Sequence, residues 1–488
     1  MIDLPDELLR WVESLVAGRV VAAERHFAGA SREAWRIDVA PEGAEQALFL
    51  LRDKGDGGGS ARDASVLRAL AATDVPVPRV LGQDSALGAI LMTRLSGASD
   101  LPALASVEAR EAISGDLMHV AAALHALDVD TLAIGHLERP RCAEDCARAP
   151  LEAVRGALEA LGATADPFFG FAHRWLEANV PDRIERVSLV HSDLGPGNFL
   201  FEGERVTGLV DWEVAHFGDP MEDLAALAVR DMATPVGSLS RRLGEYEAAS
   251  GHPVTLSRVH YYRALVLVRN ALMIGLGLAT PAEGFDVVEM TMYQTLLTRA
   301  AALVLCDNLG VSRPSAADAV SPADGSQVGA AIEPRDQARV VFLEALRRDL
   351  DREVRPAVGA GTPAARVVRA HETALSALAH EARVGPGLDA REMQEMRSLL
   401  GDSASSESAS PESASSESAS SESASPDSTS RVELEARLRD HAHADSLDPA
   451  SQHVLAAYFA RRFHRLAERR RPLMGALHER LPQPLEDA

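Results

Sequence analysis

Hydrophobic spacing divides the chain into a strand-rich N-terminal part and a longer helical part. Apolar residues recur at helical spacing within residues 1–17, which predicts an amphipathic helix. Shorter apolar runs bounded by turn residues then predict strands: a first strand between this helix and a turn at residues 28–33, then strands over residues 34–39, 46–52 and 89–95. Residues 60–72 are expected to form a helix before the last of these strands. From about residue 96 to residue 312 the spacing is mostly helical.

The last third of the chain has a different composition. Residues 313–334 are rich in Ala, Ser, Pro and Gly, which is typical of a linker. Beyond them, Leu343, Leu346 and Leu350 recur at helical spacing and predict a separate helical domain over residues 335–488. Within it, residues 402–430 form a Ser/Ala repeat punctuated by acidic residues. This insert has almost nothing to bury, so we expect it to be disordered.

One segment of the helical part carries the candidate chemistry. It reads VHSDLGPGNFLF over residues 190–201 and is followed by VDWE at residues 210–213. Phosphoryl transfer needs a carboxylate beside the attacking hydroxyl and oxygen ligands for the magnesium ions that neutralise the phosphates. Asp193 is the candidate catalytic carboxylate, and Asn198 and Asp211 are the candidate metal ligands.

A β-hairpin is expected to bring these side chains together. Residues 199–201 form a short apolar run, residues 202–204 predict a turn, and residues 206–210 predict the returning strand. Asp211 would then lie beside Asn198. Further polar residues are expected to support the structure rather than to react: His125, His191, Asp219 and Asp223.

These motifs resemble those of the aminoglycoside phosphotransferase and choline kinase-like superfamily, whose members are relatives of protein kinases. The match continues through GLVDWE and GDPMEDLA, and the resemblance covers about residues 20–310. Within the superfamily, the chain is most similar to bacterial phosphotransferases related to the kinase-like domain fused to some acyl-CoA dehydrogenases. The resemblance implies an α+β, bilobal protein-kinase-like fold followed by an all-α C-terminal domain. The β-rich N-lobe would span residues 1–95 and the mostly helical C-lobe residues 96–312.

The resemblance also implies that the chain uses ATP and Mg²⁺. Kinase N-lobes need a turn whose backbone N–H groups cover the phosphates. Gly29 and Ser31 lie in a turn between the first two strands and can supply it. Thr93 to Leu95 would form the hinge whose backbone meets the adenine.

A cation on a strand must hold the phosphates of the nucleotide. The third strand ends in Arg52 where protein kinases have Lys, and Leu50 shares its face by the period of two. We therefore expect Leu50 to pack on the adenine and Arg52 to reach the phosphates. Asp63 on the next helix would be the ion-pair partner of Arg52. Lys54 has the same parity but lies beyond the strand in a Gly-rich loop.

The favoured function is an ATP-dependent phosphotransferase that moves the γ-phosphate to a hydroxyl of a small molecule. Relatives fused to acyl-CoA dehydrogenases imply a hydroxyacyl-CoA or related metabolite, and an acyl-CoA dehydrogenase-type partner enzyme. Arg263 and Arg269 suit an anionic substrate, although both could equally be buried ion-pair partners. One alternative is an aminoglycoside-type antibiotic kinase, which acids such as Glu245 and Glu247 would favour. The other is an ATP-binding pseudokinase scaffold.

Composition narrows the range of partners. The net charge of −23 argues against general binding to nucleic acid or to an anionic membrane. No stretch of about 18 residues is free of charged residues, so we expect no membrane span. The N-terminus is acidic and has no basic leader, so we expect a cytoplasmic location. The three cysteines are too few and too scattered for a disulfide framework. We interpret the basic run from Arg461 to Arg471 as a solvated helix face in preference to a phosphate- or CoA-binding site.

Overall fold

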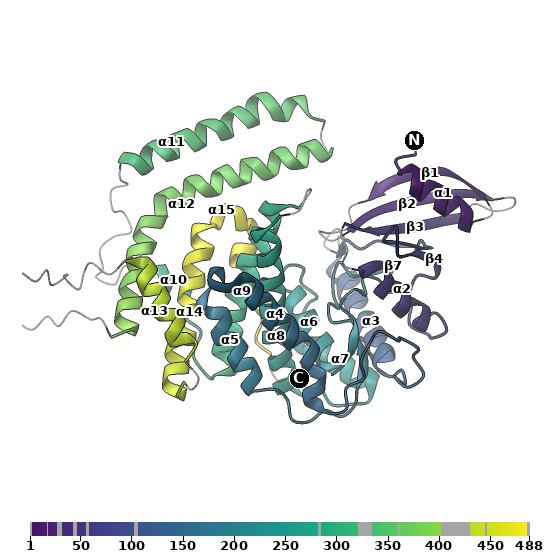
Figure 1. Cartoon of the computed structure of the whole chain (residues 1–488), viewed down its shortest axis with the longest axis horizontal. Helices are drawn as coiled ribbons and strands as arrows, with labels where there is room; N and C mark the ends of the chain where they lie inside the picture. The colour runs from purple at the N-terminus through teal and green to yellow at the C-terminus, as the bar shows by residue number, and fades with distance from the viewer. Residues whose placement is uncertain are drawn as a thin grey trace, which may run out of the picture.

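The computed structural model places a small β-rich lobe at one end of the molecule and helices over the rest (Figure 1). The residues that the structure describes are 2–16, 18–26, 32–41, 46–54, 58–101, 106–281, 285–320, 334–359, 362–401, 430–444 and 447–485. The predicted turn at Gly29 and Ser31 lies outside them, as does the repeat at residues 402–429.

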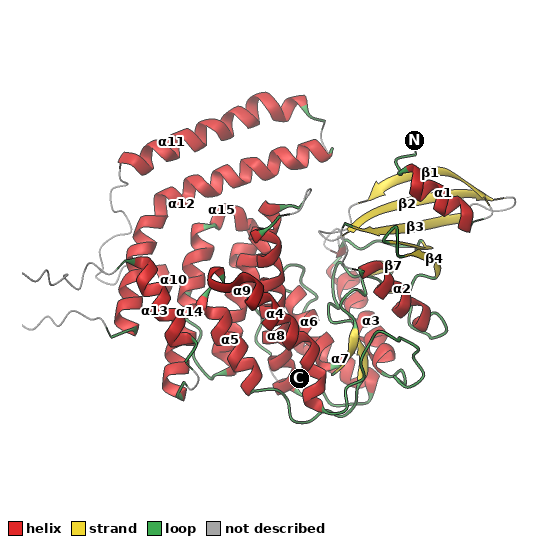
Figure 2. Ribbon diagram, viewed as in Figure 1, coloured by secondary structure: helices red, strands yellow, loops and turns green. Residues whose placement is uncertain are grey.

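The N-lobe is a five-stranded antiparallel sheet of order β1-β2-β3-β5-β4. Helix α1 (Asp6–Leu15) covers one face, where Leu50 of β3 joins its hydrophobic cluster. On the opposite face, residues of helix α2 (Gly59–Leu70) belong to the main hydrophobic core, and Leu51 of β3 packs against that core. The strands are β1 (Gly18–His26), β2 (Arg32–Pro41), β3 (Gln46–Asp53), β4 (Val80–Asp84) and β5 (Ala89–Thr93). In Figure 2 these strands form the large sheet of the molecule.

The C-lobe is helical apart from two short strand pairs. Strand β6 (Ser188–Val190) pairs with β9 (His216–Gly218), and the predicted hairpin consists of β7 (Phe199–Glu202) and β8 (Arg205–Leu209). The α+β fold with kinase-like lobes is therefore confirmed. The remaining elements are α3 (Val107–His125), α4 (Ala143–Leu161), η2 (Gly162–Thr164), α5 (Pro167–Ala178), α6 (Met221–Arg230), α7 (Leu239–Ser250), α8 (Leu256–Ala279) and α9 (Val287–Asn308).

Helix α8 is the long apolar helix at the centre of this lobe. By length and composition it could cross a membrane, and no other helix among the described residues could. In the structure α8 is packed inside the helical lobe, where Tyr262, Leu265 and Leu272 are fully buried. Helix α8 is therefore a buried core helix of the C-lobe.

The helices after the C-lobe form the predicted helical C-terminal region, which packs directly against the C-lobe. Phe459 and Phe463 pack against Phe168 of α5, with ring centroids 5.5 and 5.1 Å away, and their apolar neighbours join the core of the C-lobe. Part of the predicted linker is also folded, because α10 begins at Ala316. The C-terminal elements are α10 (Ala316–Val320), α11 (Pro334–Asp349), η3 (Leu350–Val354), η4 (Arg355–Ala357), α12 (Pro363–Leu399), α13 (Arg431–Ala442), α14 (Pro449–Arg469), α15 (Arg471–Met474) and η6 (Gly475–Glu479).

The basic run on α14 is not a solvated helix face. Arg465 is fully buried and donates to Glu395 of α12 at 3.0 Å. Arg462, only 12% exposed, pairs with Glu392 of the same helix and with Asp166 of the C-lobe. The arginines therefore hold α12 and α14 together and fix them to the C-lobe, since buried charges are stable only when they are paired.

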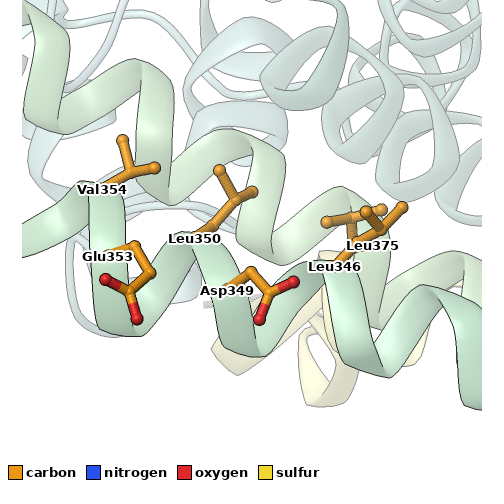
Figure 3. A pocket seen from close by; sticks show the side chains of 6 residues that line it. All are labelled: Leu346, Asp349, Leu350, Glu353, Val354 and Leu375. Carbon is orange, nitrogen blue, oxygen red and sulfur yellow. The ribbon is translucent and has the colours of Figure 1, made fainter.

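Helices α11 and α12 form an antiparallel arm along the edge of the molecule (Figure 1). A groove with a volume of about 290 Å³ opens between them, and Figure 3 shows its apolar lining of leucine and valine side chains. Its lining residues are Leu346, Asp349, Leu350, Glu353, Val354 and Leu375. None of them belongs to the N-lobe or the C-lobe, so this groove is not part of the site described below.

Candidate active site

The loop between β6 and β7 has a strained backbone that non-glycine residues rarely adopt. Ser192 has φ = 66°, and Asp211, just beyond β8, has φ = 69°. Backbone strain of this kind costs about 1–3 kcal/mol per residue and persists only where the surroundings enforce it. Gly195 and Gly197 also have positive φ values, of 144° and 97°.

Asp223 of α6 enforces this conformation. Its carboxylate accepts the backbone N–H groups of His191 at 2.8 Å and of Ser192 at 2.6 Å. His125 lies 3.0 Å from the same carboxylate through Nε2, and Tyr246 lies 2.9 Å from its other ring nitrogen. Asp223 and His125 are both buried, so the structure gives them the supporting role that the sequence predicted.

Two further buried side chains hold Ser192: Glu222 of α6 and Arg269 of α8. Ser192 Oγ donates to Glu222 at 2.5 Å, and Arg269 donates to Ser192 Oγ at 2.8 Å and to its backbone oxygen at 3.0 Å. Burial alone would raise the pKa of Glu222, but His216 and Arg269 lower it to about 2. Arg263 is likewise buried and donates to the backbone oxygen of Gln483 at 2.7 Å.

These contacts decide between the two interpretations of the α8 arginines. Arg269 supports the catalytic loop and Arg263 holds the C-terminal segment, so both are internal braces rather than sites for an anionic substrate. The acids that would have favoured a polycationic substrate are also used internally. Glu245 pairs with Arg242, and Glu247 accepts the backbone N–H of Val254 at 3.0 Å.

His191 connects the loop to the segment that follows β8. Its Nε2 lies 2.9 Å from the backbone oxygen of Val210, and its ring packs on Trp212 with centroids 4.6 Å apart. The backbone N–H of Val210 in turn donates to the backbone oxygen of Asn198 at 3.0 Å. The predicted hairpin is thus confirmed, and it brings Asp211 next to the loop.

Asp193 lies at the centre of this arrangement, with its side chain 25% exposed. Arg230, at the end of α6, donates from Nε to Oδ1 at 2.8 Å and from a terminal nitrogen to Oδ2. Burial would raise the pKa of Asp193, but the charge and hydrogen bonds of Arg230 outweigh burial and lower it. The carboxylate is therefore ionised and ready to accept a hydrogen bond from a hydroxyl.

Asn198 and Asp211 present oxygen atoms that suit a hard divalent cation. Nδ2 of Asn198 donates to the backbone oxygen and to Oδ2 of Asp193, both at 2.9 Å, which leaves its amide oxygen for another ligand. The Asp211 side chain is 43% exposed. Mg²⁺ takes few protein oxygens and completes its shell with water and phosphates, so these residues fit it. Among the described residues no group of three or more His, Cys, Asp and Glu side chains forms a metal site.

In the N-lobe, the assignment of Arg52 as the phosphate-binding residue is wrong. Arg52 points to the face of the sheet that α1 covers and pairs with Glu7 at 2.8 Å. Leu50 is buried on that same face and does not line a cleft between the lobes. The predicted ion pair between Arg52 and Asp63 is therefore not formed, because α1 occupies the face to which even-numbered residues of β3 point.

Arg32 of β2 is the cation that faces the C-lobe. Its guanidinium lies 2.5 Å from Asp63 and 2.9 Å from Glu213, which follows β8 in the VDWE segment. Asp53 and Asp211 lie farther away, at 3.8 and 3.9 Å. The Arg32 side chain is 4% exposed. It therefore joins α2 of the N-lobe to the segment that carries the candidate metal ligand.

Carboxylates outnumber cations around Arg32, and the pKa values of two of them are raised, mainly by burial. Burial raises the pKa of Asp63 to about 7, against the lowering effect of Arg32. Burial and the nearby Asp211 also raise the pKa of Glu213. An additional positive charge beside Asp211 would favour the ionised forms of Asp63 and Glu213.

The expected hinge lies at the boundary between the lobes. Thr93 ends β5 and exchanges hydrogen bonds with Arg79, its backbone N–H donating to the Arg79 backbone oxygen at 2.9 Å. Leu95 packs against Gly208 of β8, where a β-carbon added to the glycine would lie only 2.0 Å from Leu95 Cδ1. Contact of Thr93 and Leu95 with adenine stays a prediction.

The catalytic loop and the lobes around it define a phosphotransferase of the kinase-like class. Residues 28–259 match the model of the phosphotransferase enzyme family, abbreviated APH. This part of the chain is therefore similar to that family, as its loop motifs indicated.

Two curated relatives connect the chain to acyl-CoA dehydrogenases. Acyl-CoA dehydrogenase family member 11 of Rattus norvegicus is 27% identical over 179 residues, which cover 34% of this chain and 22% of that protein. The Arabidopsis thaliana protein named "Probable acyl-CoA dehydrogenase IBR3" is 31% identical over 249 residues, which cover 43% and 30%. The chain therefore spans less than a third of the length of these relatives.

Similar solved structures include two antibiotic phosphotransferases. The macrolide 2'-phosphotransferase MphH from Brachybacterium faecium is 22% identical, with a TM-score of 0.44 over 59% of this chain and 98% of the other. The aminoglycoside-3'-phosphotransferase of type VIII is 24% identical, with a TM-score of 0.42 over 54% and 98%.

Proposed function

We propose that this chain transfers the γ-phosphate of Mg·ATP to a hydroxyl group of a small molecule. The observation that carries the proposal is the convergence of an ionised carboxylate, Asp193, with two oxygen donors, Asn198 and Asp211, on a strained and fully braced loop. A scaffold protein has no need to maintain this strain or these donors. Their retention favours an enzyme over a pseudokinase.

The carboxylate of Asp193 accepts a hydrogen bond from the substrate hydroxyl and directs its oxygen at the γ-phosphorus. As the new P–O bond forms, the bond to the bridging oxygen of ADP breaks, and the hydroxyl proton passes to Asp193. Mg²⁺ bound by Asn198 and Asp211 would neutralise the charge on the phosphate oxygens. Arg32 presents a guanidinium to the phosphates from β2, held in place by Asp63 and Glu213.

The acceptor we propose is a hydroxyacyl-CoA or a closely related metabolite. The support is the similarity to proteins named as acyl-CoA dehydrogenases, whose chemistry acts on acyl-CoA thioesters. Phosphorylation would turn the hydroxyl oxygen into a group that can be eliminated. An acyl-CoA dehydrogenase-type enzyme would then be the natural partner for the product.

The surroundings of the loop also favour an acceptor that is not a polycation. Helix α8, which contacts the loop through Arg269, carries no Asp or Glu. Glu222 and Asp223 of α6 are fully buried and bonded to the loop itself. Binding a polycation would require exposed carboxylates in these positions.

A screen of acceptors tests the proposal. Hydroxyacyl-CoAs that differ in chain length and hydroxyl position are compared with aminoglycosides and macrolides, with ADP release as the readout and phosphorylated product identified by mass spectrometry. We expect phosphorylation of a hydroxyacyl-CoA that is lost in Asp193→Asn. Phosphorylation of an antibiotic and of no hydroxyacyl-CoA would show that the proposed acceptor is wrong. ATP binding without transfer to any acceptor or to water would favour the scaffold.

A further inference from the structure

Arg230 has a set of contacts that the motifs give no hint of. It is the last residue of α6, and its side chain lies along the catalytic loop. Besides its two bonds to Asp193, it donates from a terminal nitrogen to the backbone oxygen of Pro196 at 2.8 Å. A β-carbon at Gly195 would come within 2.9 Å of its side chain, and one at Gly197 within 3.2 Å. Two glycines with positive φ thus leave room for this arginine.

We propose that Arg230 is the positioning residue of the reaction, which fixes the direction of the Asp193 carboxylate and leaves Oδ1 to receive the substrate hydroxyl. The inference rests on the proposed function. A carboxylate has about four lone-pair sites. Oδ2 accepts both Arg230 and Asn198, whereas Oδ1 accepts only Nε of Arg230 among the described residues. Oδ1 is therefore the oxygen with a lone pair to spare.

The planar fork of arginine is essential to this role. Two parallel N–H groups grip both oxygens and prevent the carboxylate from rotating, whereas the ammonium group of lysine is a point charge that can hold only one side. Misplacement of a reacting group by about 1 Å can cost on the order of a hundredfold in rate. A lysine at this position would keep the charge and lose the orientation.

A second arginine in the same chain provides a matched control. Arg313 grips Asp307 with the same fork, Nε lying 2.7 Å from Oδ1, and it also donates to a proline backbone oxygen, that of Pro482, at 2.8 Å. Its side chain is 23% exposed and that of Asp307 26%, against 28% and 25% for Arg230 and Asp193. Arg313 lies beyond α9, outside the catalytic loop.

The experiment compares Arg230→Lys with Arg313→Lys in the full chain, by steady-state ATP hydrolysis and by transfer to an acceptor. We expect kcat to fall by about ten- to a hundredfold in Arg230→Lys, with KM for ATP within about twofold of the parent value. Arg313→Lys should keep the parent kcat. Guanidinium ion added to Arg230→Ala should restore part of the lost rate, which a purely structural defect would not allow.

Equal kcat values in the parent and in Arg230→Lys would overturn the proposal, as would an equal loss in the Arg313→Lys control. Crystal structures of the parent and of Arg230→Ala separate this inference from the proposed function. The carboxylate of Asp193 should be rotated in the variant. An unchanged orientation refutes the role of Arg230 even in a protein with no turnover, whereas absent turnover in the parent refutes only the proposed function.

Discussion

Replacing Arg32 should be far more damaging than replacing Arg52. Arg32 is 4% exposed and bonds to Asp63, which is 2% exposed, and to Glu213. Removing one member of a buried ion pair typically costs about 3–5 kcal/mol, because the remaining charge stays buried without compensation. Arg52 is 28% exposed and its partner Glu7 48% exposed, and a surface pair of this kind contributes only about 0–1 kcal/mol.

The assay has two readouts. Urea denaturation gives the free energy of unfolding of Arg32→Ala and Arg52→Ala, with an expected difference of about 2–5 kcal/mol between them. Titration calorimetry with Mg·ATP gives the affinity of Arg32→Lys, which keeps the charge and should fold. Lysine offers a point charge where the guanidinium can fork onto two phosphate oxygens, so the loss of one charge-assisted hydrogen bond should weaken binding by about ten- to a hundredfold, corresponding to about 1.5–3 kcal/mol.

The reasoning fails if Arg52→Ala weakens ATP binding more than Arg32→Lys does. That result would mean that the even-numbered residues of β3 face the nucleotide and that α1 covers the other side. Equal stability of Arg32→Ala and the parent would refute the assignment of Arg32 to a buried ion-pair cluster.

Three further outcomes are expected. Asp211→Ala should weaken Mg·ATP binding, measured by calorimetry, about tenfold or more, while nucleotide binding without Mg²⁺ changes little. If the affinity of Asp211→Ala for ATP depends on Mg²⁺ as strongly as that of the parent, Asp211 is not a metal ligand. His464 is buried, and burial and the nearby Arg299 lower its pKa to about 4 from 6.5. The neutral form therefore stabilises the fold above pH 6.5, and this contribution is lost as the pH falls toward 4. Between pH 7 and pH 5 the parent should therefore lose about 2 kcal/mol that His464→Leu does not lose in urea denaturation, and parallel losses would contradict this. Asp389→Asn should lower the melting temperature by a few degrees at most, because it weakens the partly exposed ion pairs of Arg469 and Arg431 that join α12 to α14 and α13.

The catalytic loop could be predicted from the sequence because its determinants are local. Asn198 and Asp211 are separated by one hairpin, and the turn and strand signals between them are strong enough to set the pairing of Phe199 with Leu209. Supporting roles for His191 and Asp223 followed from the same motif. Local patterns of this kind fix which residues meet without any knowledge of the rest of the fold.

The role of Arg32 as the cation that faces the C-lobe could not be predicted, because period-two alternation gives the two faces of a strand but not which face meets the C-lobe. Leu50 and Arg52 do share a face, as the alternation indicated, but α1 covers that face. Arg32 meets Asp63 and Glu213 from 31 and 181 residues away, and no local pattern announces these contacts. The position of α1 on the sheet is set by tertiary packing, which the alternation within a strand does not reveal.

Arg230 is absent from the residues predicted from the motifs, although a helical signal for it exists. It lies seven residues after Asp223, two turns along the same face of α6. Since Asp223 holds the backbone of the catalytic loop, a side chain on that face also reaches the loop. Placing supporting residues on a helix face, rather than interpreting each motif position alone, identifies it.

The C-terminal helices differ from their prediction because the pairing of their charged residues and the burial of their apolar residues depend on each other. Arg462 and Arg465 resemble a solvated stripe in the sequence, but Glu392 and Glu395 on α12 neutralise them. Once the arginines are paired, Phe459 and Phe463 are free to enter the core of the C-lobe. Ion pairs between distant helices are invisible to helical periodicity.

The central claim is tested most directly by the transfer of the γ-phosphate with and without the carboxylate of Asp193. Transfer of ³²P from γ-labelled ATP to water and to the best acceptor is measured for the parent, for Asp193→Asn and for Asp130→Asn, whose side chain is 82% exposed in the parent. General-base catalysis contributes about 10²–10⁴-fold, so Asp193→Asn should lose transfer by that factor while ATP binding is retained and Asp130→Asn stays at the parent rate. Transfer by Asp193→Asn at the parent rate would contradict the account.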